Sequence, residues 1–370
     1  LDNIKKIINE EEGTNCVNVF NGALYFWHHF GEENSHSLAD YVGGYATYTL
    51  MGGVQAYSTD ALINATGAAG NKVPERYISV NQGFFVEASL DAALDSTTTT
   101  VSGGNIVFKN SQRVFERERY TGTNDGSLFF KTSDKAKIKE TQKNTDTRAK
   151  IRLQFKSPKG YYRELLVGED KNATNNFDIG YDAPIADLGN EDMFWVFNNS
   201  KFVIQAVNNF DNDQKLPLGI ILEKDGLISI RIDSLENIDS SVKIYIRDNV
   251  IGETYQINNQ PFEINLEVGE YLERFALVFK PRLRTLQETT LIEGIHTRMN
   301  NSISELEVRK IVDTKIKSIN LYNYLGQLIN SWENNLDERF ISLPVKAAKG
   351  AYIVKINTSD GAISKKIIIE

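Results

Sequence analysis

The residues in this chain that are best suited to metal chemistry are three histidines close together near the start. His28, His29 and His36 are the only clustered histidines, and imidazole nitrogens are common zinc ligands. Neighbouring residues on a strand point to opposite faces, so His28 and His29 cannot both face one metal ion without distortion. Cys16 is the only cysteine and adds no thiolate pair. We therefore favour surface or loop histidines, with zinc binding as the alternative.

Two groups of aspartates raise the question of calcium. Asp211-Asn212-Asp213 has the oxygen density of a calcium loop, but it lacks the sixth-position glycine and the twelfth-position glutamate of an EF-hand. Asp178 and Asp182, on either side of Gly180, are equally ambiguous. We expect no cofactor, and calcium in an irregular loop is the alternative.

Nothing in the sequence marks a catalytic centre. There is no Gly-x-Ser-x-Gly elbow and no phosphate-binding loop. A carboxylate pair for glycoside hydrolysis cannot be picked out of 49 acidic residues. Four aromatic residues could stack on sugars, although aromatics in strands more often pack in a core: Tyr25, Phe26, Trp27 and Trp195. We expect this chain not to be an enzyme.

Composition limits the remaining classes of function. A chain of 370 residues has room for two or three domains. The net charge of -8 argues against a general nucleic-acid binder. No apolar run approaches the roughly 18 residues that a membrane-spanning helix needs, so we expect no direct membrane span. One cysteine excludes an intrachain disulfide.

Short alternating runs separated by turn residues predict an all-β fold. Residues 1–145 are rich in glycine and aromatics and resemble part of a β domain, with a short helix expected at 5–12. Residues 146–283 alternate strand after strand, which predicts a β-sandwich of the jelly-roll type. We expect strands at 23–28, 45–51, 83–88, 105–109, 151–155, 227–232, 242–247, 262–266 and 274–279. Residues 280–301 lack a clear period, which indicates a linker.

The last part of the chain, residues 302–370, predicts a small separate β-sandwich of the immunoglobulin-like type. Its alternating runs are bounded by Gly, Asn and Asp, the usual turn residues of antiparallel strands. We expect strands at 316–322, 328–332, 340–343, 349–356 and 363–370.

The motifs of this last part have a family resemblance. It contains Leu321-Tyr322-Asn323-x-Leu325-Gly326-Gln327, then Lys349-Gly350-x-Tyr352-Ile353-Val354-x-Ile356, and then a strand with two lysines. The combination resembles the C-terminal sorting domain of proteins exported by the type IX (Por) secretion system of Bacteroidetes. The family's shared positions fall on Leu321, Tyr322, Gly326, Gln327, Gly350, Tyr352, Ile356, Lys365 and Lys366.

The resemblance implies a route and a set of partners. Such a protein crosses the periplasm and the outer membrane and is secreted or displayed on the cell surface. The implied partners are the outer-membrane translocon, a shuttle protein and a sortase that removes the domain and attaches the cargo to lipopolysaccharide.

Physical reasoning assigns most of these positions structural roles. Gly326 and Gly350 stand where a turn needs positive φ or a close approach, and Tyr352 and Ile356 share a core face. Lys365 and Lys366 lie on opposite faces of the closing strand. That strand could add to the edge of a partner's sheet, or its lysines could simply keep an exposed edge soluble, and both interpretations stay open.

The upstream region also resembles a segment that precedes the sorting domain in many large surface proteins. Residues 23–28 match its Leu-Tyr-Phe-Trp element, and residues 82–86 match its Gln-Gly-Phe-Phe-Val element. The resemblance implies that the chain, which starts at Leu1, begins inside a domain and is the C-terminal part of a longer export product. We expect an adhesion or stalk module with a glycan or other surface ligand. The alternatives are a secreted hydrolase with its catalytic domain upstream and a carbohydrate-binding module.

Overall fold

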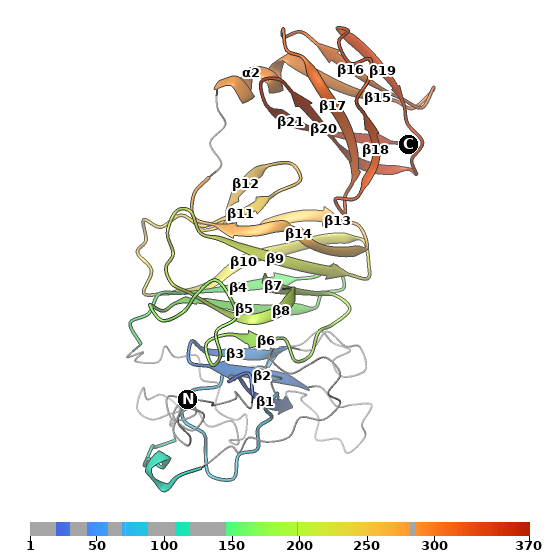
Figure 1. Cartoon of the computed structure of the whole chain (residues 1–370). Coiled ribbons are helices and arrows are strands. Elements are labelled where there is room, and N and C mark those ends of the chain that lie inside the picture. Colours follow the sequence, from blue (N-terminus) through green and yellow to red (C-terminus); the bar gives the residue numbers. More distant parts are fainter. Residues whose placement is uncertain are drawn as a thin grey trace, which may run out of the picture.

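The computed structural model describes most of the chain. The described residues are 20–29, 43–57, 69–70, 72–87, 108–118, 146–197, 199–281 and 286–370, with the side chains of 286–289 excepted. The expected helix at 5–12, His36 and most of the expected strand at 105–109 lie outside these residues. Figure 1 shows a stack that runs from an N-terminal sheet through a large sandwich to a C-terminal module.

The N-terminal sheet is a three-stranded antiparallel meander. It consists of β1 (Leu24–His29), β2 (Gly43–Thr49) and β3 (Gly52–Tyr57), in that order. The expected strands at 23–28 and 45–51 are thus confirmed with shifted ends. Residues 83–88 were expected to form a strand as well, but the described part of that segment forms only an isolated bridge between Phe85 and Tyr25. Alternation alone does not make a strand where only one residue pairs.

The large sheet has eleven strands. They are β4 (Lys150–Lys156), β5 (Tyr162–Glu169), β6 (Ala183–Pro184), β7 (Asp192–Phe197), β8 (Ser200–Val207), β9 (Lys215–Leu222), β10 (Gly226–Glu236), β11 (Tyr245–Asp248), β12 (Glu253–Gln256), β13 (Phe262–Leu266) and β14 (Gly269–Val278). Their order is β12-β11-β14-β9-β7-β8-β5-β4-β10-β13, with β6 on β8. Within this sheet β5 and β8 are parallel and the other pairs are antiparallel.

The sheet folds over on itself to make a sandwich (Figure 1). Strands β13 and β14 follow each other in the chain but lie in opposite layers. The rings of Phe262 and Phe275 pack between them, with ring centres 5.8 Å apart. Inward-pointing side chains, which alternate with outward-pointing ones, fill the space between the layers. Ile228 and Ile230 of β10 are fully buried, whereas Arg231 is exposed. The indole of Trp195 is also buried and donates a hydrogen bond to the carbonyl of Leu166 at 3.0 Å.

The N-terminal sheet packs against the sandwich and shares its core. Ala23, Tyr25, Met51 and Val54 belong to the same buried cluster as the sandwich residues. Strand β5 is consequently buried along most of its length, because β3 lies against it. The expected division near residue 145 stays a prediction, since the apolar core crosses that point.

The C-terminal module has a core of its own. It contains α2 (Leu286–Gly294), β15 (Ile295–Asn300), β16 (Glu305–Lys310), β17 (Ile316–Asn323), β18 (Leu328–Trp332), β19 (Phe340–Pro344), β20 (Gly350–Thr358) and β21 (Ala362–Ile369). Two sheets, β15-β16-β19 and β18-β17-β20-β21, enclose a separate apolar cluster. The expectation of an all-β chain that ends in a small sandwich is confirmed.

One expectation about this module was wrong. Residues 280–301 were expected to be a linker, but most of the segment forms α2 and β15. Strand β15 pairs with β16 from Ile295 to Asn300, and Ile295 is fully buried. The helix carries no clear apolar stripe, so only tertiary pairing reveals these elements.

Candidate functional site

The structure places His28 and His29 next to each other on β1, and His36 lies outside the described residues. The side chain of His28 is buried and that of His29 only half-buried, as alternation along β1 requires. Among the described residues, no three His, Cys, Asp or Glu side chains lie close enough to hold a metal ion.

The aspartates considered as calcium ligands are engaged in their own loops. The Asp211 carboxylate accepts the amide of Asp213 at 2.8 Å, and Asp213 pairs with the ammonium of Lys280. Asp178 accepts the amide of Thr174 at 2.5 Å and its hydroxyl at 3.1 Å. The contacts of Asp211 and Asp178 shape turns, as Asp side chains commonly do, whereas the Asp213–Lys280 pair joins distant segments.

Asp182 lies in a very different environment, because it is fully buried. Its two carboxyl oxygens accept the amides of Ala206 and Asp178, each at 2.6 Å. Burial nevertheless dominates and raises the pKa of Asp182 to about 8. Burial likewise raises the pKa of Asp187 to about 6, although Arg163 opposes that shift. Burial thus favours the protonated form of both carboxyls over the charged form.

This burial predicts an unusual dependence of stability on pH. An unfolded Asp loses its proton near pH 4, whereas folded Asp182 keeps it to about pH 8. The folded state therefore binds more protons in this window, so the free energy of unfolding should fall as pH rises. Above about pH 6 Asp187 has titrated, and the slope from Asp182 is at most about 1.4 kcal/mol per pH unit. Urea denaturation at several pH values from about 6.5 to 8 measures this change in unfolding free energy.

The matched control is Asp182→Asn, which cannot titrate. Its unfolding free energy should lose most of this slope, even if the variant is less stable at every pH. A wild-type stability that rises across the window, or an unchanged slope in Asp182→Asn, would contradict the assignment.

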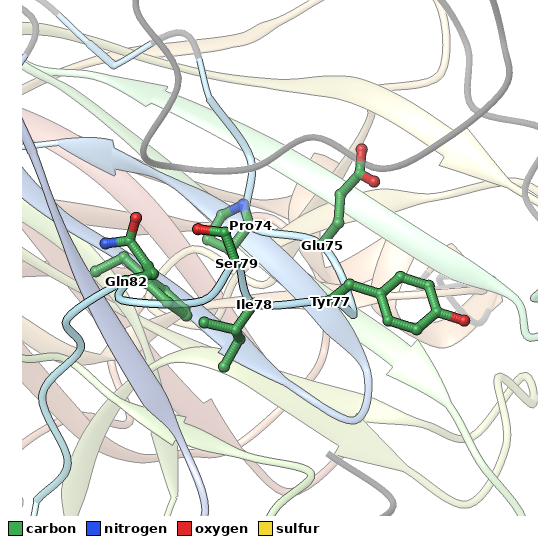
Figure 2. Close-up of a pocket in the computed structure, with 7 residues that line it drawn as sticks. Pro74, Glu75, Tyr77, Ile78, Ser79 and Gln82 are labelled. Atoms are coloured by element: carbon green, nitrogen blue, oxygen red, sulfur yellow. The ribbon is translucent and has the colours of Figure 1, made fainter. Parts of the chain in front are cut away.

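One small cavity lies beside the N-terminal sheet. Figure 2 shows the loop that lines it, with the ring of Tyr77 turned away from Gln82. Its volume is about 10 Å³, room for roughly one water molecule. Typical small-molecule sites have roughly 300–1,000 Å³. The hydroxyl of Ser79 and the amide oxygen of Gln82 are buried there and find no hydrogen-bond partner in the structure.

The first sorting motif forms a tight turn between β17 and β18. The Asn323 side-chain oxygen accepts the amides of Leu325 and Gln327 at 3.0 and 2.9 Å, and its amide nitrogen donates to the Gln327 side chain at 2.9 Å. Gly326 has a φ of +83°, which confirms the expected need for glycine. We call this segment, residues 323–327, the motif turn.

The other motif positions mostly fill the module's core. Leu321 and Ile356 are fully buried, and Tyr352 is buried with its hydroxyl donating to the Ala348 carbonyl at 2.9 Å. Tyr322 is half-buried on β17. Gly350 has a φ of +155°, as expected for a turn that opens β20.

The two lysines of β21 have separate contacts. Lys365 donates to the carbonyl of Ile292 in α2 at 2.7 Å. Lys366 is exposed, and its ammonium lies 5.5 Å from the ring centre of Tyr324 in the motif turn. Strand β21 pairs with β20 along one side. Addition of this strand to a partner's sheet stays a prediction.

Sequence reasoning missed the residues that join the module to the sandwich. Arg274 of β14 donates to the carbonyl of Tyr324 at 2.7 Å, and Leu325 packs against the sandwich core. A signal was present, because Tyr324 and Leu325 are two apolar residues at the apex of a turn, where polar residues are usual.

Comparison with known proteins assigns both parts of the chain. The family model described as "Domain of unknown function (DUF8693)" matches residues 3–279, and the one described as "Secretion system C-terminal sorting domain" matches residues 300–370. No curated protein and no solved structure matches the chain. Within the described residues, no helix is long and apolar enough to cross a membrane.

The sorting domain fixes the route of the protein. It makes the chain a cargo of the type IX secretion system, which interacts with that machinery and is exported to the cell surface or the medium. With three quarters of its length matched by one model, the chain belongs to the family known as the domain of unknown function DUF8693, here joined to a type IX sorting domain.

Proposed function

We propose that the region upstream of the sorting domain is a rigid, non-catalytic stalk or adhesion module on the surface of a Bacteroidetes bacterium. The observation that carries the proposal is the way in which buried and partly buried arginines tie each layer of the stack to the next. Charged hydrogen bonds of this kind are stronger and more directional than neutral ones. They suit a module that must hold its shape outside the cell.

Two of these arginines fix the N-terminal sheet to the sandwich. Arg148 donates to the Leu50 carbonyl at 2.5 Å, and Arg152 donates to the Gly53 carbonyl at 2.7 Å. Arg152 is also held by Glu164 and Glu236, each at 3.0 Å. The main chain around the β2–β3 turn is therefore anchored by charged groups of β4 and its surroundings.

A second candidate function, carbohydrate binding, is favoured by exposed aromatic rings beside the N-terminal sheet. Phe85, Phe108 and Phe115 are exposed by 59%, 70% and 90%. Aromatic faces bind sugars by stacking. The N-terminal sheet lies at the end of the stack that is away from the sorting domain (Figure 1).

Incubation of the purified chain with polysaccharide and peptide panels separates these functions. Saturable binding without turnover that Phe115→Ser weakens supports a carbohydrate-binding adhesion module, and no binding supports a stalk. Turnover of any substrate would overturn the non-catalytic proposal and favour a hydrolase.

The resemblance of the sorting domain also supports its removal by a sortase at the surface. Mass spectrometry of the surface form would then show loss of the C-terminal module. A surface form that retains residue 370 would argue against cleavage.

A further inference from the structure

The motif turn does not face solvent at its apex. Tyr324 is only 8% exposed, although it lies at the end of a hairpin. The turn points at the end of the sandwich where β11 and β14 pair. Gly269 and Arg274 receive it, and Asp248 holds Arg274 in place. We call these three sandwich residues the docking surface.

Arg274 supplies the polar part of this contact. It is 4% exposed, and its Nε and Nη2 donate to one oxygen of the fully buried Asp248 at 3.1 and 2.8 Å. The remaining nitrogen, Nη1, donates to the carbonyl of Tyr324 at 2.7 Å. Asp248 thus orients the guanidinium so that one N–H is aimed at the sorting domain.

The ring of Tyr324 adds a second interaction with charge. The guanidinium carbon of Arg274 lies 5.1 Å from the ring centre, and the ammonium of Lys366 lies 5.5 Å from it. Both distances are within the range of cation–π attraction. A cation from the sandwich and a cation from β21 therefore meet the same ring.

Leu325 supplies the apolar part, and a glycine makes room for it. A Cβ at Gly269 would lie 2.1 Å from a methyl carbon of Leu325, a distance that no real side chain tolerates. Gly269 also has a φ of +151°. A residue with a side chain at this position would push Leu325 out.

We propose that the docking surface is a receptor for the motif turn in the same chain. Cargo domain and sorting domain are thereby held as one rigid body. While the turn is docked, the apex residues Tyr324 and Leu325 are withdrawn from other partners. An export partner must then bind other faces of the sorting domain, or the turn must first be released.

The test measures whether the two domains tumble together. ¹⁵N relaxation of the full chain should give the same rotational correlation time for amides of β20 and of β14. Leu325→Asp places a carboxylate in the apolar contact, so the β20 amides should relax with a shorter correlation time than the β14 amides. The matched control is Leu328→Asp, because Leu328 is exposed and lies three positions away. Unlike Leu325, it is not among the residues that pack against the sandwich core.

Two checks keep the test decisive. Unchanged chemical shifts in β20 and β21 show that Leu325→Asp remains folded. Arg274→Lys keeps a cation beside Asp248 but loses the fork that reaches Tyr324, so it should also shorten the β20 correlation time. Independent tumbling in the wild-type chain would overturn the proposal, as would equal behaviour of the two aspartate variants or coupled tumbling in both Leu325→Asp and Arg274→Lys.

Discussion

Removal of residues 286–370 should leave the protein in the periplasm. These residues form the complete C-terminal module, including α2 and β15, which lie outside the 300–370 match or begin before it. Because the sorting domain is what the export machinery reads, we expect almost complete loss of the surface and medium forms. Cell fractionation followed by immunodetection of the sandwich measures the effect.

A pair of point variants tests whether the folded sorting domain is required, without shortening the chain. Ile356 is fully buried on β20, whereas its neighbour Lys355 is exposed. Ile356→Asp should break the module's core and block export as the deletion does, since a buried unpaired charge is strongly destabilising. Lys355→Asp adds the same side chain at the surface and should leave export unchanged. Normal display of the truncated protein would refute the assignment.

Asp192→Ala should strongly destabilise the sandwich. The Arg163 guanidinium donates two parallel hydrogen bonds to the Asp192 carboxylate, from Nε at 2.8 Å and from Nη2 at 2.7 Å. Both side chains are buried. Asp192 also accepts the amide of Gly189 at 3.0 Å. Without Asp192, Arg163 keeps only the Asp187 carboxylate, at 3.2 Å, as a charged partner. We therefore expect a loss of about 3 kcal/mol of unfolding free energy, the lower end of the range for a broken buried pair.

Asp233→Ala is the control for this prediction. Asp233 pairs with Arg231 at 3.5 Å in an exposed position, where ion pairs contribute little. Equilibrium urea denaturation of the two variants should show a large loss for Asp192→Ala and almost none for Asp233→Ala. Similar losses would mean that the Arg163 pair is not a principal support of the fold.

The parts of the fold that follow from local pattern were predictable from the sequence. The expected strands at 262–266 and 328–332 coincide with β13 and β18, because both are bounded by turn residues and the first alternates strictly. The same reasoning found the positive φ of Gly326. These features depend on neighbours in the sequence and need no knowledge of the fold.

Features that depend on distant contacts were not predictable. Asp182, Arg163 and Arg274 are indistinguishable by type from surface charges, and only the packing of other strands buries them. The parallel pairing of β5 with β8 joins segments that local alternation cannot align. The docking of the motif turn is of the same kind, since Tyr324 meets a residue fifty positions earlier.

The most direct test of the central claim is transfer of the signal. Residues 286–370 are fused behind an unrelated periplasmic protein and expressed in a bacterium that has a type IX system. The passenger should reach the surface or the medium, and the same fusion with Ile356→Asp should stay inside. A passenger that remains in the periplasm with the intact module attached would contradict the account.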